Sequence, residues 1–426
     1  MKNGLLNSLG LSRETFSSNF TPMLAILIIA ITIITPKFFN ELYVMVLWSV
    51  FFLLELDIIF RSNRNLGILL TLGVMFISIC VIYAFIGISS ASLGYCIHSP
   101  LMFFAPVLAL MVIEKCNNEQ QIRFIFHFLA LAIAINIADN IRLTYQIGLE
   151  GIVYSKLSGM MEDEGLTGLN LGGSGFVNLA VFYSCIMFMA FLKIKNKKEK
   201  LLFLIYVGIS TYFITFCSLK ASAIILMLLS MVLMYVSVKS EERAGMALSM
   251  TIICGGLIYL FRDVIINFFI DIIDSNRVTS RLSALTTEAD LEDSGSFSSR
   301  SELWQVSLQS WLSSVKSFLF GIGDHDWKKF MTTADSGIGN HSDFFDVCAR
   351  YGILGALILY SSIKIYYDYL QKRFGAFFRY EIITIIILLL AIGFTKRFIT
   401  GQQAVAIFIL FPLALRYCYN KNTIQT

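Results

Sequence analysis

Long apolar runs, separated by short polar segments, dominate this chain on both sides of one polar stretch between about residues 262 and 350. A helix needs about 20 mostly apolar residues to cross the hydrocarbon core of a bilayer, so the runs predict about twelve transmembrane helices. We expect them at Phe20–Thr35, Leu42–Phe60, Leu66–Ile88, Pro100–Ile113, Ile122–Ala138, Leu171–Ile194, Leu201–Cys217, Ala221–Val238, Ala244–Phe261, Tyr351–Tyr369, Ile382–Phe394 and Val405–Tyr419.

Composition supports this prediction. Of the 426 residues, 57% are hydrophobic and only 15% are charged, whereas soluble domains contain about 25% charged residues. We therefore predict an all-α integral membrane protein. The net charge of +4 is too small, and the basic residues are too scattered, to indicate nucleic-acid binding. No small-residue cleavage site follows the first apolar run, which we expect to remain as an uncleaved anchor.

Lysine and arginine are concentrated in alternate loops, most densely in the sequence KIKNKKEK at residues 193–200. Because short cytoplasmic loops are enriched in basic residues, this pattern places both termini in the cytoplasm. Two long loops, at about 139–170 and 262–350, then face the opposite side. The chain accordingly divides into an N-terminal helix bundle (1–261), a large outer loop (262–350) and C-terminal spans (351–426).

The large outer loop contains an amphipathic helix. Ser299 followed by Glu302 forms a capping-box pattern, which predicts a helix start. Apolar residues then recur at helical spacing, as expected for a helix that lies on the membrane surface or packs on the spans. They are Trp304, Leu308, Trp311, Leu312, Val315, Phe318 and Leu319. Arg300 falls in the first turn, where an arginine beside helix N-terminal amides can bind an anion. The alternative is a surface arginine paired with Glu302.

A second helix is predicted at the end of this loop, in the sequence GIGNHSDFFDVCARYGILG (337–355). Asn340 is a candidate N-cap with Asp343 three residues later, and Asp346 and Arg350 are four apart with the acid first. His341 would then occupy the first helical position, where the helix dipole keeps the imidazole neutral near pH 7. A neutral imidazole there is a competent general base. The alternative is a histidine that only caps or packs.

Other polar residues of the outer side carry less specific signals. Arg277 and Arg281 are four apart, so if the segment is helical they share a face that either binds an anion or is simply solvated. Lys220 lies in a tight turn between two spans, where it can snorkel or hold a phosphate. His325 stands between two aspartates, but no second histidine follows at ligand spacing, so we predict no metal site.

The order of Arg300, Trp304, the turn LFGIG, His341 and YGILG resembles the bacterial O-antigen polymerase and O-antigen ligase family. In that family an arginine, a tryptophan-bearing helix and a Gly–x–Gly turn precede a histidine, a short helix and a Gly–Ile–hydrophobic–Gly sequence that enters a span. A turn between two spans usually reads Ser–Arg in the family. Here it reads Ser218–Leu219–Lys220.

The resemblance implies a GT-C-like, metal-independent glycosyltransferase without a cofactor, in the bacterial inner membrane and with a periplasmic active site. Its donor would be a saccharide on undecaprenyl diphosphate, and its acceptor a sugar hydroxyl on another such lipid-linked repeat unit. His341 would be the general base and Arg300 the first diphosphate ligand, supported by Lys220, Arg277 and Arg281. Its other partners would be membrane lipids and a chain-length regulator protein.

Two alternatives stay open. An O-antigen ligase, which moves finished polymer onto lipid A core, would share the fold and the chemistry. We favour a polymerase because the Ser–Arg turn is altered here. A polysaccharide transporter or flippase commonly shows inverted repeats and ionisable residues in mid-membrane. The polar residues of this chain gather instead in one outer loop.

Overall fold

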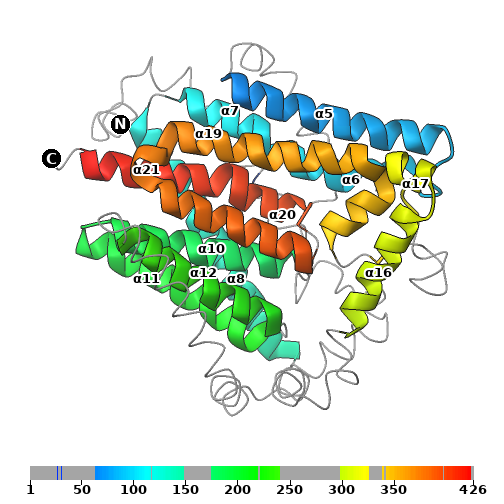
Figure 1. Cartoon of the computed structure of the whole chain (residues 1–426). Helices are drawn as coiled ribbons and strands as arrows, with labels where there is room; N and C mark the ends of the chain where they lie inside the picture. Colours follow the sequence, from blue (N-terminus) through cyan, green and yellow to red (C-terminus); the bar gives the residue numbers. More distant parts are fainter. Residues whose placement is uncertain are drawn as a thin grey trace, which may run out of the picture.

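The computed structural model describes residues 26, 30, 63–116, 118–147, 174–218, 221–239, 298–325, 338–339, 342–396 and 398–423. Within these ranges every regular element is a helix, as Figure 1 shows. Eight of the described helices are long and apolar enough to cross a membrane, which confirms the predicted all-α membrane protein. Three expected spans, Phe20–Thr35 (apart from Ile26 and Ala30), Leu42–Phe60 and Ala244–Phe261, lie outside the described residues. The total of about twelve therefore stays a prediction.

The first described spans follow the apolar runs, with shifted ends. They are α5 (Arg64–Phe85), a broken span made of α6 (Leu93–Phe104) and α7 (Pro106–Lys115), and α8 (Glu119–Ile147). The broken span begins at Leu93 and not at Pro100, because the Ser92 side chain accepts a hydrogen bond from the Tyr95 amide and caps the helix there. Pro106 occupies the first position of α7, where its missing N–H leaves no bond unmade.

The middle of the chain forms a packed helical hairpin and a third span. These are α10 (Ser174–Lys193), α11 (Lys197–Tyr212) with its π-helical continuation η2 (Phe213–Cys217), and α12 (Ala221–Lys239). The Asn196 side chain caps α11 through the Lys198 amide, within the basic turn that connects α10 and α11. At the end of α10, Lys193 Nζ lies 2.8 Å from Glu381 Oε1, and both side chains are almost fully buried.

The longest element, α19 (Asp343–Thr395), is three helical segments rather than one rod. Gly352 and Phe378 have non-helical backbone angles, and the ribbon folds back on itself (Figure 1). We call the parts the short segment (343–351), the outgoing segment (353–377) and the return segment (379–395). The outgoing and return segments match the predicted spans Tyr351–Tyr369 and Ile382–Phe394.

The last span consists of α20 (Gly401–Ala404), π-helical η6 (Val405–Leu410) and α21 (Phe411–Thr423). It is the most enclosed of the described spans, because 94% of an 18-residue apolar stretch within Gly401–Tyr419 is buried. The outer helices α5 and α12 instead expose apolar side chains such as Val74 and Ile225. An apolar side chain can face outward without penalty where the surroundings are lipid.

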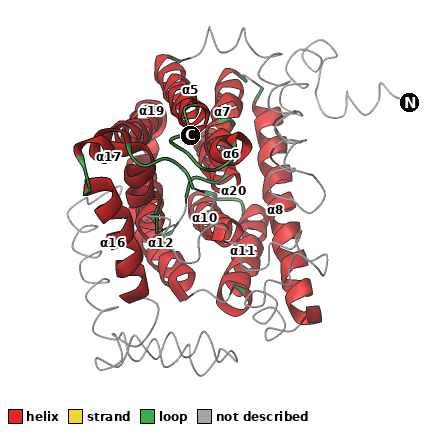
Figure 2. Cartoon of the chain, turned by 90° about the vertical axis from the view of Figure 1, so that its right-hand side faces the viewer, coloured by secondary structure: helices red, strands yellow, loops and turns green. Residues whose placement is uncertain are grey.

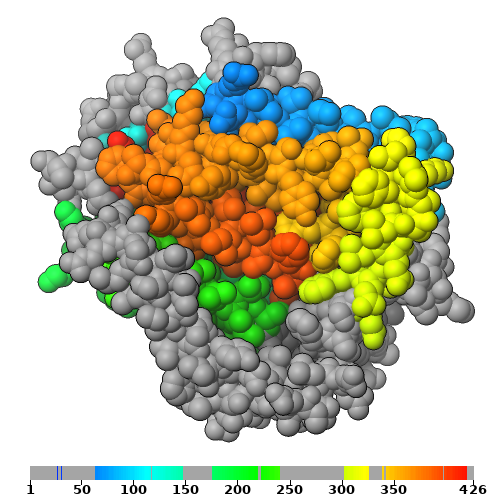
Figure 3. Space-filling view, viewed as in Figure 1, coloured from blue at the N-terminus to red at the C-terminus, as the bar shows by residue number. Residues whose placement is uncertain are grey.

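The two ends of the bundle differ in what they carry. Helices α16 (Ser298–Leu312) and α17 (Val315–Phe320) lie at one end, and α21 finishes at the other (Figure 1). Seen from the first end, α16 and α17 occupy one flank, and α8 and α11 the other (Figure 2). In the space-filling view the surface of α16 and α17 adjoins that of α19 (Figure 3).

The predicted amphipathic helix is broken in two. It begins at Ser298, so Ser299 is not the N-cap, and it stops at Leu312. Ser314 then caps α17 in a reciprocal capping box with Ser317. The buried residues of these helices are Ser307 and Ser317, while Leu312 and Val315 are 60% and 77% exposed. The apolar stripe therefore faces outward over its second half, and does not form a core.

A glycine turn after α17 docks on the first bend of α19. The Ile322 and Gly323 amides donate to the carbonyls of Ala349 and Arg350, at 2.8 and 2.9 Å. Gly352 has a φ of 63°, and a Cβ there would overlap the backbone of Leu319. Only glycine combines this backbone conformation with so close an approach.

Gly352→Ala is expected to lower the stability of the protein by about 1–3 kcal/mol, because it adds a strained left-handed residue and a clash with α17. Thermal unfolding in detergent measures the loss as a lower Tm. Gly208→Ala on α11 is the matched control, since nothing lies within 4 Å of its added methyl group. A Gly352→Ala variant that unfolds at the wild-type temperature would contradict the close docking.

Candidate functional site at the α16–α19 end

Of the predicted site residues, the structure describes only Arg300, and of that residue only its place in a helix. It lies in the first turn of α16, as the sequence predicts. The other four, Lys220, Arg277, Arg281 and His341, lie outside the described residues. The site is therefore built from the described residues that flank His341 and from the helix that carries Arg300.

The residues on both sides of the Asn340–His341 pair are anchored to one serine–aspartate pair. The Gly339 amide donates to Ser307 Oγ at 2.8 Å, and Ser307 Oγ donates to Asp346 Oδ1 at 2.7 Å. The Ser342 amide donates to the other oxygen, Asp346 Oδ2, at 3.3 Å. Ser307, Ser342 and Asp346 are at most 1% exposed. A single buried carboxylate thus holds both ends of the loop that contains His341.

The same contacts bring this loop against the helix that carries Arg300. Gly339 packs so tightly on α16 that a Cβ would overlap the Leu303 carbonyl. Leu303 lies about one helical turn after Arg300, and Ser307 about two turns after it on the same face. Residues far apart in the sequence, on α16 and before α19, therefore meet at one end of the bundle.

The start of α19 corrects one prediction. The helix begins at Asp343, so its N-cap is Ser342 and not Asn340, and His341 is not its first residue. The Ser342 hydroxyl makes no capping bond and donates instead to the Gly393 carbonyl at 3.1 Å. The sequence prediction that the helix dipole keeps His341 neutral assumed that His341 is the first helical residue, and the observed helix start does not support that assumption.

Asp343 ties the end of the return segment to this start. Its Oδ2 accepts hydrogen bonds from the Phe398 and Ile399 amides, at 2.5 and 2.6 Å. Its own amide donates to the Lys396 carbonyl at 3.4 Å. The buried side chain of Lys396 belongs to this connection between α19 and α20. Sequence reasoning did not single out Lys396, because a lysine after an apolar run resembles an ordinary span end.

A buried ion pair holds the glycine turn to α19 and to the loop after α5. Arg350 Nε lies 3.2 Å from Asp324 Oδ1, and the Tyr351 hydroxyl donates to Asp324 Oδ2. The Asp324 amide donates to Ser89 Oγ at 2.9 Å. The sequence suggested that Arg350 supports its own helix through Asp346. In the structure it reaches Asp324, which sequence reasoning passed over as part of a turn.

His325 is the histidine of this end whose surroundings are described. Its Nδ1 lies 2.8 Å from Ser90 Oγ, in the loop between α5 and α6. Burial lowers the pKa of His325 below its ordinary value of 6.5, although the neighbouring Asp324 opposes this. Its imidazole is accordingly neutral at neutral pH. Among the described residues, no group of three or more histidine, cysteine, aspartate or glutamate side chains could hold a metal ion.

The described residues form a multi-pass helical membrane protein in which an amphipathic loop helix packs on the start of a span. Residues 209–360 match the family model described as O-antigen ligase. The matched region contains Lys220, Arg277, Arg281, Arg300 and His341, and it confirms the resemblance to the O-antigen polymerase and ligase family. It supports a glycosyltransferase-like enzyme of O-antigen biosynthesis. A comparison with curated proteins gives no match.

Ser307→Ala is expected to loosen the loop, because it removes the hydroxyl that accepts from the buried Gly339 amide and donates to Asp346 Oδ1. An unsatisfied buried polar group costs about 1–3 kcal/mol, so exchange of the Gly339 amide should rise about tenfold or more. Hydrogen–deuterium exchange of the peptide around residues 338–346 measures it. Ser313→Ala, at an exposed serine of the same segment, is the control. Unchanged exchange in Ser307→Ala would rule out the anchoring role.

Proposed function

We propose that this protein is a polysaccharide polymerase that joins lipid-linked repeat units outside the cytoplasm. The donor is a glycan on undecaprenyl diphosphate, and the acceptor is a sugar hydroxyl of another undecaprenyl-diphosphate-linked repeat. The observation that carries the proposal is the set of hydrogen bonds from Gly339 to Ser307 and from Ser307 and Ser342 to Asp346. They anchor the residues that flank His341 on the helix that carries Arg300.

In the proposed reaction, His341 accepts the proton of the attacking hydroxyl while its oxygen bonds to the anomeric carbon of the donor. The bond from that carbon to the diphosphate breaks, and the lipid diphosphate leaves with the electron pair. A hydroxyl is a poor nucleophile and gains from a positioned base. The diphosphate is a weak base already, so it needs charge stabilisation rather than a strong acid. No step requires a metal ion or a cofactor.

Cationic side chains supply that stabilisation. We assign Arg300 first, because a guanidinium can bind two phosphate oxygens in a fork and because Arg300 lies at a helix N-terminus. Lys220, Arg277 and Arg281 support it as further positive charges of the matched region.

We assign the site to the periplasmic face of the inner membrane. The basic turn between α10 and α11 caps the end of the bundle opposite α16 and α17 (Figure 1). By the rule that basic short loops stay inside, that end faces the cytoplasm, and the α16–α19 end faces outward. Lipid-linked repeat units that have crossed the membrane would reach it there.

The O-antigen ligase is the second candidate, because the matched family model carries that description. Gel analysis of the surface glycan in cells that lack the gene separates the two. A polymerase defect leaves core with a single repeat unit, whereas a ligase defect leaves bare core and accumulates lipid-linked polymer. The second pattern would overturn the polymerase assignment.

His341→Ala is expected to reduce polymer formation by about 100-fold or more, because the attacking hydroxyl loses its base. Reconstituted protein with a defined lipid-linked repeat unit measures this, at matched protein abundance. His127→Gln on α8, whose ring bonds to the Tyr417 hydroxyl, is the control for loss of a histidine. Normal polymer from His341→Ala would remove the assignment of the base.

Arg300→Lys is expected to lower activity about tenfold or more, because an ammonium group cannot reproduce a two-point contact with the diphosphate. Initial rates in the same assay measure the loss. Arg142→Lys is the matched control, since Arg142 is 58% exposed and forms a surface pair with Asp139. If Arg300→Ala polymerised at the wild-type rate, the diphosphate contact would lie elsewhere.

A further inference from the structure

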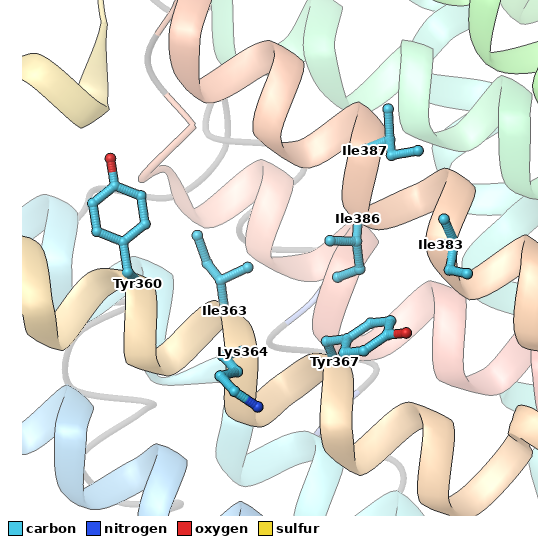
Figure 4. A pocket seen from close by; sticks show the side chains of 7 residues that line it. All are labelled: Tyr360, Ile363, Lys364, Tyr367, Ile383, Ile386 and Ile387. Carbon is cyan, nitrogen blue, oxygen red and sulfur yellow. The ribbon is translucent and has the colours of Figure 1, made fainter.

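A groove runs between the outgoing and return segments of α19, on the apolar surface of the bundle. It has a volume of about 420 Å³, and Figure 4 shows the residues of both segments that line it. They are Tyr360, Ile363, Lys364, Tyr367, Ile383, Ile386 and Ile387. Tyr360 and Ile387 are each 43% exposed, so the groove is open to the surroundings of the protein.

The groove is lined by branched aliphatic and aromatic side chains. Its one charged residue, Lys364, directs its amine to Asp368 at 2.7 Å, one turn further along the outgoing segment. Both segments match predicted spans, so the medium at this surface is lipid. Lipid tails are as apolar as isoleucine, and hydrophobicity alone therefore cannot select an occupant. Selection has to come from the fit of shapes and from dispersion contacts.

A chain of aromatic rings connects the groove to α16. The Tyr360 ring stacks on Phe344 at 5.2 Å between centroids, and Phe344 meets the edge of Phe394 at 4.7 Å. Phe394 lies 6.1 Å from Phe345, which in turn lies 5.8 Å from Trp304. The rings come from the short, outgoing and return segments of α19 and from α16. They form a chain of five rings in contact, the aromatic path, in which Phe344 is buried and the other four rings are at least partly exposed.

The path ends one helical turn from Arg300, which lies at the start of α16. Phe394 is 46% exposed, and Phe345 and Trp304 are partly exposed, so a chain lying along the path could touch several rings. The exposed or partly exposed rings of Tyr360, Phe394, Phe345 and Trp304 therefore lie between the groove and the helix that carries the proposed diphosphate ligand.

We propose that this groove and the aromatic path leading to it hold the isoprenoid tail of the lipid-linked donor. The inference rests on the proposed function, and it adds the binding site for the tail. A polyisoprenoid carries a methyl branch on every unit, and in this proposal the branches make dispersion contacts with the isoleucine side chains that line the groove. Binding the tail here positions the attached diphosphate at the start of α16.

Photo-crosslinking tests occupancy without requiring catalysis. Undecaprenyl phosphate with a diazirine in its tail is added to the full-length protein in phosphatidylglycerol vesicles. Labelling is expected in the peptides that contain Ile363 and Ile387, and an excess of plain undecaprenyl phosphate should reduce it at least about fivefold. Equal labelling by a diazirine-bearing phosphatidylglycerol would overturn the proposal, because the groove would then hold any lipid. Protein–protein crosslinks through these residues would assign the groove to a second copy of the chain and would also overturn it.

A groove-filling substitution tests the effect on transfer. Ile387→Trp is expected to raise KM for an undecaprenyl-linked donor about tenfold and to leave kcat within about twofold. A donor with a short farnesyl tail, which does not reach the groove, should keep its KM. Ile135→Trp is the control, at an exposed isoleucine of α8. An equal loss with both donors, or no loss with either, would overturn the proposal.

The two experiments separate this inference from the proposed function. If plain undecaprenyl phosphate reduces crosslinking but the wild-type protein transfers no glycan, the polymerase proposal is wrong and the tail-binding site is supported. If the wild-type protein transfers glycan but plain undecaprenyl phosphate does not reduce crosslinking, the polymerase proposal is supported and the tail-binding site is wrong.

Discussion

The bend of α19 at Gly352 is the constraint on which the outer end of this protein depends. A helix that bends sharply leaves carbonyls without their usual partners, and in or near lipid each such group must find another donor. The glycine turn after α17 supplies those donors through the amides of Ile322 and Gly323. The bend is therefore stable only with the turn docked on it, and the turn brings α16 and α17 with it.

Three buried carboxylates also hold irregular segments together at the end of the bundle that carries α16 and α17. Asp324, Asp343 and Asp346 are each less than 5% exposed, and each accepts hydrogen bonds from side chains or amides of a different segment. A carboxylate has room for about four hydrogen bonds, so one buried side chain can join several pieces of backbone that lack regular structure. Breaking such a junction is costly, because it leaves an uncompensated polar group in an apolar setting. Irregular loops can thus be held firmly at the rim of a membrane bundle.

The opposite end is held by ion pairs, of which Lys193–Glu381 is almost fully buried and others are partly exposed. Arg416 reaches Glu119, and Arg373 reaches Glu114, across helices that are distant in sequence. These pairs close the end of the bundle that carries the basic turn between α10 and α11. Partly exposed pairs of this kind contribute modestly to stability. At the site the junctions are carboxylates that accept hydrogen bonds from amides and hydroxyls, and Ser307 and Asp346 there are at most 1% exposed.

Much of the fold follows from the sequence, because the length of an apolar run is a local property, and a run of about 20 residues matches the thickness of the bilayer. The apolar runs that begin between Leu66 and Val405 locate the described spans. Arg300 lies in the first turn of α16, as predicted. The local signals mislead at boundaries. Ser299 and Asn340 look like caps, yet α16 begins at Ser298, and Ser342 is the cap of α19. At the start of α19, the Ser342 hydroxyl donates to the Gly393 carbonyl of another segment, which a local sequence pattern does not reveal.

By itself, the sequence determined that the chain is helical and apolar enough for a membrane, and which family it resembles. Tertiary structure alone decided that Asp346 serves Ser307 and Ser342, that Arg350 pairs with Asp324, and that five aromatic rings join a groove to α16. The physical reason is one of range. Periodicity reports the surroundings of a residue along its own helix. The pairs Ser307–Asp346, Asp324–Arg350 and Trp304–Phe345 lie tens of residues apart and meet only when the loop folds onto the spans.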